Sequence, residues 1–421
     1  MLERRRTAIY LIMAVSLFAG LVTGRTFFFN VTYAFTGLLI FSFIWAWTSA
    51  HWLRLTRQTR ARRAQVGHWF EERFSVRNTG IMPKLWLEIY DHSSLPGHHA
   101  SHIVTNLGVK AVAAWPVRTL CIHRGEYTLG PLRVIAGDPF GLFEVERSVG
   151  AIAQVVVYPA TVSLPRFGIP TGILPGGEAL RRRTHQITTN AAGVRDYQPG
   201  DSLNRVHWPS TARKGRMIVK EFELDPLADI WIMLDEDQTV HTGEPNLSLF
   251  DAGLTASPSN GHALLPASTE EYGVCIAASL AQHFIEKERA VGLAVSGRHQ
   301  ERIQVDRGPR QLTKFLETLA VVQKGSSVSF DQLLTIEGGQ LSRGTTVVVV
   351  TPSTRETWVE AVTLLLRRGL RVMAALIDGE TFGGRPGIRH AANRLNALKI
   401  PTVVIKHSDD LVEALSIMRV R

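Results

Sequence analysis

The side chains best suited to chemistry form a short acidic cluster, Asp235, Glu236 and Asp237, followed by Thr239. They come directly after the apolar run 230–234, which is typical of a buried central strand. Ligands of open α/β sheets bind beyond the carboxyl ends of such strands. Because Mg²⁺ prefers oxygen ligands, Asp235, Asp237 and Thr239 are a candidate for a degenerate magnesium site. The alternative is a solvated acidic turn without metal.

A second group of candidate residues is basic. Residues 181–220 contain nine Lys and Arg residues against two Asp residues. Such a face can receive an acidic partner or a phosphate, or its arginines can form a structural ion-pair network with Trp208 packed beneath. We do not expect nucleic acid, because the aromatic side chains are too few to stack bases. The candidate residues are Arg195, Tyr197, Pro199, Gly200, Asp201, Arg205, Trp208, Arg213, Lys220 and Glu221, with Arg181, Arg182 and Arg183 as the basic face.

This segment carries a resemblance to a known family. The run from Gly193 to Asp201, then Arg205, His207-Trp208, Thr211-Ala212-Arg213 and Val219-Lys220-Glu221, resembles the core motif of domain-of-unknown-function family 58. Members are membrane-anchored bacterial proteins with a von Willebrand factor A-like domain, often associated with AAA-type ATPases of the MoxR kind. No catalytic residues are established for the family, so the resemblance implies none here.

The resemblance also bears on the acidic cluster. Von Willebrand A domains place Asp-x-Ser-x-Ser after the first strand to hold Mg²⁺. This chain keeps Asp235, has Asp237 and Thr239 at the two serine positions, and has Thr351 where a further aspartate of the metal site is expected. These departures argue against a working metal site.

Recognisable catalytic motifs are absent from the sequence. It contains no Walker A loop, no Gly-x-Ser-x-Gly elbow, no His-Glu-x-x-His and no spaced cysteine pairs. An enzymatic reading therefore requires the Asp235/Asp237 edge to bind metal and activate water, as a metal-dependent hydrolase. We expect instead that the chain is not an enzyme.

The elements that position the acidic cluster form a C-terminal α/β domain over residues 226–421. Apolar runs of strand length alternate with helical patterns, which predicts a mostly parallel sheet of the von Willebrand factor A-like kind. Residues 239–270 interrupt this alternation as a loop insertion rich in Pro, Gly, Ser and Asn, either a partner-binding lid or slack.

Residues 67–160 read as a β-rich, sandwich-like module, because short runs of period two alternate with turn residues. His98, His99 and His102 are expected in a solvated loop rather than at a metal. The stretch Asp138-Pro139-Phe140-Gly141 is expected to form a corner that docks the module on its neighbour. Residues 161–225 then form the signature segment.

The N-terminal residues 1–50 predict a transmembrane hairpin, with spans at about 7–23 and 27–47. The alternative, a cleaved signal peptide, suits the basic start but lacks a small-residue cleavage site. Residues 51–66 form a basic juxtamembrane segment. Because residues 1–70 hold nine arginines and one acid, the positive-inside rule places both termini in the cytoplasm. The two cysteines, Cys121 and Cys275, are expected to be buried and unpaired.

Composition narrows the class of protein. The chain has 421 residues, a net charge of +10 and 45% apolar residues, which excludes disordered, collagen-like and disulfide-rich proteins. The sequence therefore predicts a multidomain membrane protein: a transmembrane hairpin, a β-rich module and an α/β domain. Its expected function is a membrane-anchored, cytoplasmic protein-interaction adaptor or scaffold, with the cell membrane and a MoxR-type AAA ATPase as partners.

Overall fold

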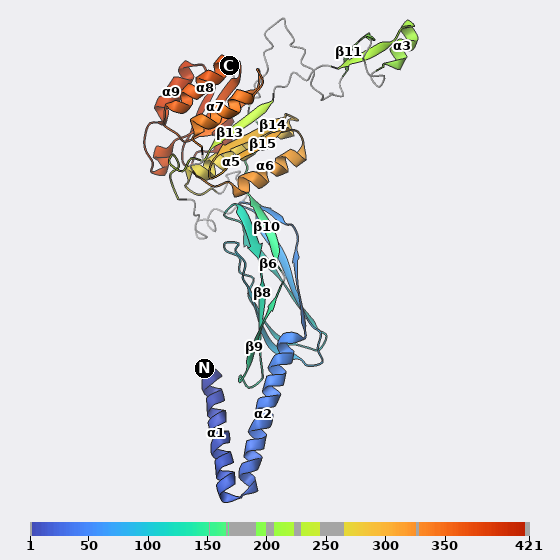
Figure 1. Ribbon diagram of the computed structural model, residues 1–421, viewed down its shortest axis with the longest axis vertical. Coiled ribbons are helices and arrows are strands. Elements are labelled where there is room, and N and C mark those ends of the chain that lie inside the picture. Colours follow the sequence, from blue (N-terminus) through green and yellow to red (C-terminus); the bar gives the residue numbers. More distant parts are fainter. Residues whose placement is uncertain are drawn as a thin grey trace. The chain divides into compact units, whose positions relative to one another are not determined.

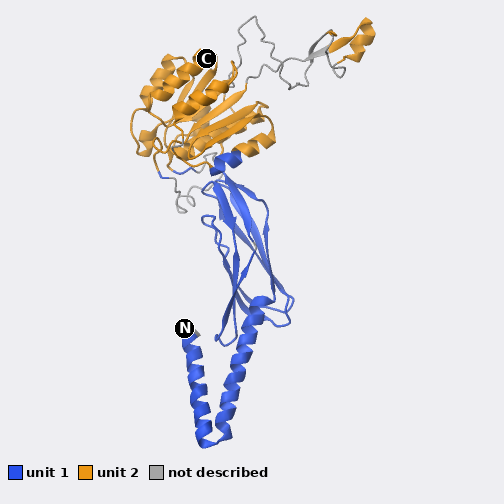
Figure 2. Cartoon of the chain, in the orientation of Figure 1, with its two compact units in different colours: residues 1–160, 244–266, 316–321 blue, residues 161–243, 267–315, 322–421 orange. Residues whose placement is uncertain are grey.

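The computed structural model describes residues 2–150, 152–165, 167, 191–198, 206–222, 229–244, 265–325 and 328–416. The chain divides into two compact units (Figures 1 and 2). Unit 1 holds residues 1–160 with the stretches 244–266 and 316–321, and unit 2 holds the remainder.

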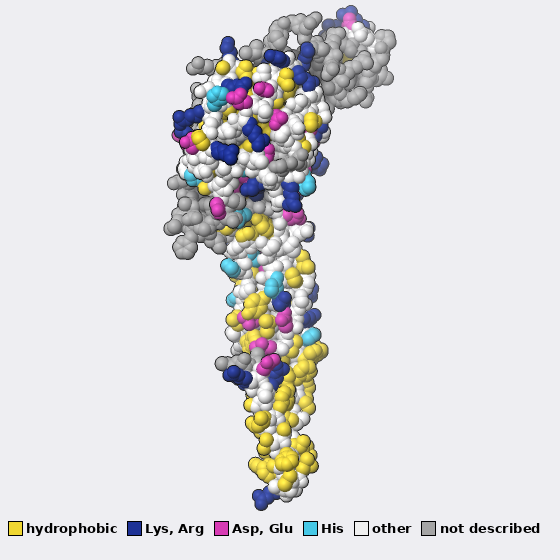
Figure 3. All heavy atoms as spheres, turned by 60° about the vertical axis from the view of Figure 1, so that its left-hand side comes forward, with side chains coloured by type: hydrophobic (Ala, Val, Ile, Leu, Met, Phe, Trp, Pro, Cys, Tyr) yellow, Lys and Arg dark blue, Asp and Glu magenta, His cyan; other side chains and the backbone are white. Residues whose placement is uncertain are grey.

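Unit 1 begins with two long apolar helices, α1 (Leu2–Thr23) and α2 (Thr26–His51), which turn back on each other at Gly24. Segments of 21 and 26 residues, with mean hydropathy 1.7 and 1.8, are long and apolar enough to cross a membrane. Only 11% and 6% of these segments is buried within the structure. Apolar side chains accordingly cover the helical end of unit 1 (Figure 3). The structure thus contains two candidate membrane-spanning helices.

The C-terminal end of α2 is part of the core of the following β-sandwich. Ala50 is buried among the sandwich side chains. The buried Lys84 donates from Nζ to the carbonyl oxygen of Thr48 at 2.7 Å, and Arg147 donates to the carbonyl oxygen of His51 at 2.7 Å. Both cations sit at the negative end of the helix dipole. Burial lowers the pKa of Lys84 to about 8.

The sandwich is antiparallel apart from one short parallel pair. Its sheets have the orders β1-β3-β6, β5-β4-β8-β9 and β2-β10-β7. Phe74 and Trp115 of the sheet β1-β3-β6 pack with Leu87 and Val134 of the sheet β5-β4-β8-β9 in the core. The strands are β1 (Leu53–Thr59), β2 (Arg63–Gln65), β3 (Trp69–Asn78), β4 (Lys84–Asp91), β5 (His102–Leu107), β6 (Val112–Leu120), β7 (Gly125–Leu129), β8 (Leu132–Gly137), β9 (Glu144–Val149) and β10 (Ala153–Tyr158).

A charged cluster lies inside this sandwich. The side chains of Arg57, Glu72, Asp91 and His98 are 3%, 0%, 1% and 0% exposed. Arg57 contacts both carboxylates, and His98 Nε2 lies 2.9 Å from Asp91 and 3.3 Å from Glu72. Burial raises the pKa of Glu72, whereas hydrogen bonds from His98 and Ser93 outweigh burial and lower the pKa of Asp91. The expectation that His98 is solvated is therefore wrong: its ring is in the core.

Unit 2 is built on a six-stranded sheet of order β15-β14-β13-β16-β17-β18. All neighbours are parallel except the β14–β15 hairpin at the edge. Every residue of β13, β14 and β16 is buried, which explains their continuous apolar runs. The strands are β13 (Ile230–Asp235), β14 (Val291–Ser296), β15 (Gln300–Asp306), β16 (Thr346–Thr351), β17 (Arg371–Ile377) and β18 (Thr402–Ile405).

Helices cover both faces of this sheet (Figure 1). One face, with Trp231 and Met233, packs against α7 (Phe330–Gln340), α8 (Thr357–Arg367) and α9 (Ile388–Ala397). On the other face, Gly273 of α5 (Thr269–Glu286) lies against Leu234 and Ile377. Residues 309–315 of α6 (Pro309–Val321) belong to unit 2 and residues 316–321 to unit 1, whereas η3 (Gly379–Phe382) and α10 (Leu411–Ser416) lie within unit 2. A mostly parallel α/β sheet is thereby confirmed.

The signature segment contributes a small separate element. Strands β11 (Ala191–Asp196) and β12 (Ile218–Phe222) pair antiparallel, and the short helix α3 (Trp208–Lys214) lies between them in sequence. Gly215 ends α3 with φ +65°, a left-handed conformation that costs a glycine little.

Sequence patterns and structure differ at three places. Residues 51–66, expected as a juxtamembrane segment, contain β1 and β2, because the sandwich begins two residues after α2. The sequence patterns did not predict strand β15 or helix α7. The side chains of β15 are mostly exposed, so the strand has no apolar run, and two adjacent glycines weaken the helical pattern of α7. Cys121 and Cys275 are buried and unpaired, as expected.

The two adjacent glycines of α7 offer a test of the packing of unit 2. A Cβ on Gly338 would collide with the buried Leu365 of α8, whereas the nearest atom to a Cβ on Gly339 is Arg368 Nη1, 3.4 Å away. We expect Gly338→Ala to destabilise the protein by about 1–3 kcal/mol through overpacking. The matched change Gly339→Ala should be neutral or stabilising by up to about 1 kcal/mol, since alanine favours helix.

The measurement is denaturant unfolding of the full chain in detergent, read by hydrogen exchange of β16 and α8. Equal effects of the two substitutions would show that α7 and α8 are not packed as described.

Candidate functional site

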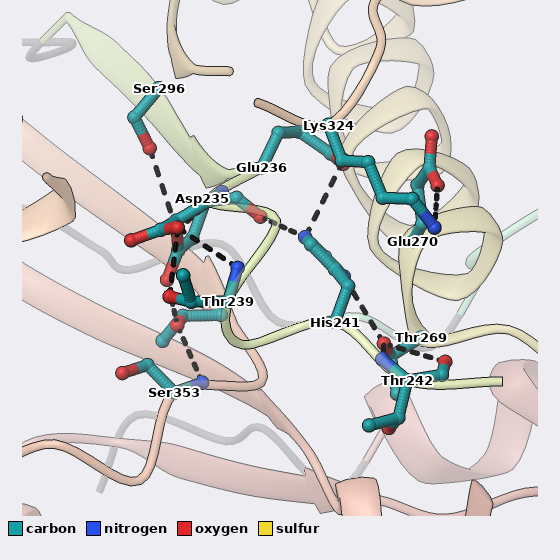
Figure 4. Close-up of polar contacts among 12 residues, drawn as sticks. Asp235, Glu236, Thr239, His241, Thr242, Thr269, Glu270, Ser296, Lys324 and Ser353 are labelled. Atoms are coloured by element: carbon teal, nitrogen blue, oxygen red, sulfur yellow. Dashed lines mark hydrogen bonds and ion pairs between the residues drawn. The ribbon is translucent and has the colours of Figure 1, made fainter. Parts of the chain in front are cut away.

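Asp235 is the centre of a buried hydrogen-bond network at the carboxyl end of β13 (Figure 4). Its side chain is fully buried and joins three strand ends. Thr351, the last residue of β16, donates from Oγ1 to Oδ2 at 2.6 Å. Ser296, the last residue of β14, lies 3.5 Å from Oδ1, and the amide of Asp237 donates to Oδ1 at 3.2 Å. The carboxyl therefore fixes the edge of the sheet.

Burial in this network changes the acidity of the group. Desolvation raises the pKa of Asp235 to about 7, although the hydrogen bonds from Thr351 and from the Asp237 amide act in the opposite direction. The raised pKa allows the carboxyl to take up a proton at a higher pH than an exposed aspartate does, so it serves as a hydrogen-bonding hub more than as a fixed negative charge.

The chain after Asp235 is held by His241. Its Nε2 lies 2.9 Å from the carbonyl oxygen of Asp235 and 3.5 Å from Glu236 Oε2. Its Nδ1 lies 3.1 Å from Thr269 Oγ1, which also accepts from the amide of Thr242 at 2.9 Å. Thr242 and Thr269 thereby join the two ends of the insertion expected at 239–270. The expected lid itself, residues 245–264, lies outside the described residues.

Arg355 is the exposed part of the site, and it pairs with the buried Asp237. Asp237 Oδ1 accepts from both the amide and the hydroxyl of Thr239, at 3.0 and 2.9 Å. Arg355 Nη1 lies 3.4 Å from Asp237 Oδ2, and Nη2 donates to Thr239 Oγ1 at 2.9 Å. Half of the Arg355 side chain is exposed, while Asp237 is 8% exposed. A guanidinium therefore stands over the acidic turn and remains open to solvent.

A small, shallow hollow opens at this edge. The residues lining it come from the ends of β13 and β16 and from α7 and α8: Asp235, Asp237, Val240, Phe330, Asp331, Ser353, Arg355, Thr357 and Trp358. Trp358 Nε1 donates to the carbonyl oxygen of Ser353 at 3.2 Å, which fixes the loop that carries Arg355. The hollow is thus a rigid, polar surface with one half-exposed cation.

The arrangement fits a metal ion poorly. Oxygens of Asp235, Asp237 and Thr239 are engaged by protein donors, and Arg355 already supplies positive charge at Asp237. Mg²⁺ requires near-octahedral oxygen ligation and loses water reluctantly. Among the residues described, no three His, Cys, Asp or Glu side chains converge as metal ligands. The magnesium site remains a prediction without a supporting geometry.

The structure describes only some of the signature residues. Pro199, Gly200, Asp201, Arg205 and the basic face Arg181, Arg182 and Arg183 lie outside the described residues, as do the side chains of Arg195, Lys220 and Glu221. Trp208 packs beneath the segment in one of the two interpretations of the sequence, but 64% of its surface is exposed. Tyr197 is half-buried, Arg213 is exposed, and Arg216 pairs with Asp196 at 3.1 Å.

The sequence already places Thr351 at this edge, and one rule would also have found Ser296. Ser296 and Thr351 each end an apolar strand, as Asp235 does, and parallel strand ends meet at one edge. His241 and Arg355 carry no such signal. Arg355 reaches Asp237 across 118 residues, through a loop whose course only the folded chain determines.

The comparison with known families covers part of this site. A family model described as "Protein of unknown function DUF58" matches residues 193–248, which include β11, α3, β12, β13 and the acidic turn. Over these residues the match supports the resemblance to DUF58 that the sequence motif indicated. Because the description of DUF58 names no activity, the match identifies the segment shared with relatives and assigns it no reaction.

The similar proteins found add little about function. Uncharacterized protein YeaD from Bacillus subtilis (strain 168) is 29% identical over 115 residues, which is 27% of this chain and 29% of YeaD. The CARDB domain of the PF1109 protein from Pyrococcus furiosus is 14% identical, with 25% of this chain and 91% of that domain covered and a TM-score of 0.19. The beta-glucosidase from Listeria innocua is 9% identical, with 25% of this chain and 16% of that enzyme covered and a TM-score of 0.18. Scores this low carry no argument.

The raised pKa of Asp235 predicts a pH dependence of stability. Between its ordinary pKa of 3.8 and its folded value of about 7, the folded state binds a proton that the unfolded state has lost. The free energy of unfolding should fall as pH rises through this window, by up to about 1.4 kcal/mol per pH unit from this group.

Asp235→Asn should remove this contribution. Urea unfolding of the full chain at several pH values measures it as the difference between the two proteins, which cancels the titration of all other groups. Parallel curves for wild type and variant would contradict a raised pKa.

The Arg355–Asp237 pair predicts the response to Mg²⁺. A ligand that binds only the folded state raises the unfolding temperature. Because Arg355 already occupies the acidic turn, we expect equal unfolding temperatures in Mg²⁺ and in EDTA. Stabilisation by Mg²⁺ in wild type that is lost in Asp237→Asn would instead establish the predicted metal site.

Proposed function

We propose that this chain is a membrane-anchored protein-interaction adaptor or scaffold, and that it is not an enzyme. The observation that carries the proposal is Arg355, whose guanidinium is held at the mouth of a rigid hollow while remaining half exposed. A fixed, solvent-accessible arginine is suited to bind a carboxylate of a partner protein, since arginine forms strong charge-assisted hydrogen bonds at interfaces.

The architecture of unit 2 supports assigning it to the von Willebrand factor A-like class. The central strand β13 ends in the acidic turn, and the order β15-β14-β13-β16-β17-β18 has one antiparallel edge strand. In this proposal Arg355 supplies the positive charge that a bound metal ion would supply, and a carboxylate of the partner protein pairs with Arg355 directly.

The partner we propose is a MoxR-type AAA ATPase, the class that the resemblance to the family implies. The signature element offers a second contact surface. Trp208 is 64% exposed, Met217 is 38% exposed, and Arg213, Lys214 and Arg216 are exposed around them. An exposed tryptophan among basic side chains is the composition of an interface hot spot for an acidic surface.

We further propose that α1 and α2 anchor the chain in the cell membrane with both termini in the cytoplasm. Arginines flank both candidate spans, at residues 4–6 and at 54–63, while Arg25 alone lies in the turn between them. The positive-inside rule assigns the arginine-rich flanks to the cytoplasmic side.

The test is capture of the ATPase by the full chain in detergent, with and without nucleotide. Wild type should retain a MoxR-type AAA ATPase, and Arg355→Glu should reduce the captured amount about tenfold, the effect of about 1.4 kcal/mol. Trp208→Ala reports separately on the signature element.

The matched control is Arg367→Glu, which makes the same charge reversal at the exposed last residue of α8. It should leave capture unchanged. Capture of no ATPase by wild type, or equal losses in the two arginine variants, would refute the proposal.

A further inference from the structure

The turn between β8 and β9 is a rigid loop that presents an aromatic side chain to the outside. Asp138 is buried, and its carboxylate accepts hydrogen bonds from three backbone amides of the turn. These are Phe140 at 2.9 Å, and Leu142 and Phe143 at 2.7 Å each. Leu142 is buried beneath the turn, whereas Phe140 is 50% exposed. The hydrogen bonds to the buried carboxylate of Asp138 thus hold the turn in a conformation that leaves the Phe140 ring exposed.

The same loop contacts both N-terminal helices. The ring of Phe143 packs edge-on against Phe43 of α2, with centroids 5.7 Å apart. The guanidinium carbon of Arg6, in α1, lies 5.7 Å from the centroid of the same ring. The turn therefore lies beside α2, on the side of the chain's N-terminus (Figure 1).

These contacts set the level of the loop along the helices. Phe43 precedes the end of α2 by eight residues, about 12 Å along the helix axis. Gly20 of α1 lies against Phe29 of α2, so the antiparallel register puts Arg6 level with Phe43. Arg6 is also the last charged residue before the apolar part of α1. The turn thus reaches the level at which α1 becomes apolar.

The surroundings of the loop have the composition of a membrane interface. On α2, Phe43, Ile44 and Trp47 are 51%, 49% and 42% exposed, and this apolar surface continues along both helices (Figure 3). The exposed Arg4 and Arg5 lie beside Arg6 at the start of α1. Exposed aromatic rings with neighbouring arginines are typical of the level at which lipid headgroups meet the acyl chains.

We infer that the β8–β9 turn is a membrane-contacting wedge, in which Phe140 inserts into the lipid interface beside the helices while Arg4 and Arg5 bind lipid phosphates. The occupant of this apolar surface is the bilayer, because the surface is continuous with the apolar faces of α1 and α2. The inference rests on the proposed membrane anchoring. Beyond that anchoring, we infer that the sandwich contacts the bilayer at two places, α2 and this turn, which together determine its distance from the membrane.

The experiment places an environment-sensitive fluorophore on single cysteines in the full chain. The native Cys121 and Cys275 are buried, so the unsubstituted chain serves as the labelling control. The labelled variants are Phe140→Cys, Trp69→Cys and Ile40→Cys, reconstituted in vesicles of phosphatidylcholine and phosphatidylglycerol. Quenching by spin-labelled lipid is compared with quenching by aqueous iodide.

Trp69 is the matched control for Phe140. It is an exposed aromatic residue of the same sandwich, 59% exposed. It begins β3, whose last residue Asn78 pairs with Leu53 next to α2, so nine residues or about 30 Å of strand separate it from the helices. Ile40 of α2 is 56% exposed and reports on the anchoring itself.

We expect the label at 140 to be quenched by the lipid and to lose accessibility to iodide, with a blue-shifted emission, as at 40. The label at 69 should be quenched by iodide alone. If 40 contacts lipid and 140 behaves like 69, the wedge is refuted and the anchoring stands. If neither 40 nor 140 contacts lipid, the membrane anchoring fails as well. Shielding of 140 from both quenchers would show that protein covers the loop, which also refutes the wedge.

Discussion

The architecture of unit 1 depends on the fusion of α2 with the β-sandwich. The last turn of α2 belongs both to an apolar helix and to the sandwich core, because Ala50 is packed among sandwich side chains. Lys84 and Arg147 bind the carbonyl groups that the end of a helix leaves exposed. A buried ammonium is costly unless it is hydrogen-bonded, so Lys84 and the end of α2 require each other. Only one residue separates α2 from β1, and the end of the helix is packed and hydrogen-bonded to the sandwich, so the orientation of α2 and that of the β-strands are coupled.

The acidic edge of unit 2 follows a similar logic. A carboxyl buried as deeply as Asp235 is tolerated because three hydrogen-bond donors surround it and because its raised pKa lets it take up a proton. This hub joins three strand ends, beside which Arg355 pairs with Asp237 at the surface. A preorganised arginine loses less entropy when a partner binds, which suits recognition.

The sequence pattern predicts a helix or strand correctly where the burial of its side chains alone determines that element. The apolar runs of β13, β14 and β16 and the helical spacing of α5 and α8 are visible because every residue, or one full face, is buried. The edge strand β15 was missed because its side chains are largely exposed, and α7 was missed because Gly338 and Gly339 weaken the helical pattern. The glycine that weakens the pattern is the one that lets α8 approach, since a Cβ at Gly338 would strike Leu365.

The sequence by itself determined the two apolar helices, the strand-rich region, the α/β alternation and the acidic turn at Asp235, because each depends on neighbouring residues and on the hydrophobic effect. Tertiary structure alone decided which charges meet. Arg355 reaches Asp237 across 118 residues, His98 joins Arg57, Glu72 and Asp91 inside the sandwich, and Arg6 meets Phe143 beside α2. Long-range pairs of this kind leave no local periodicity, because a charged side chain is buried only where the folded chain brings it a partner.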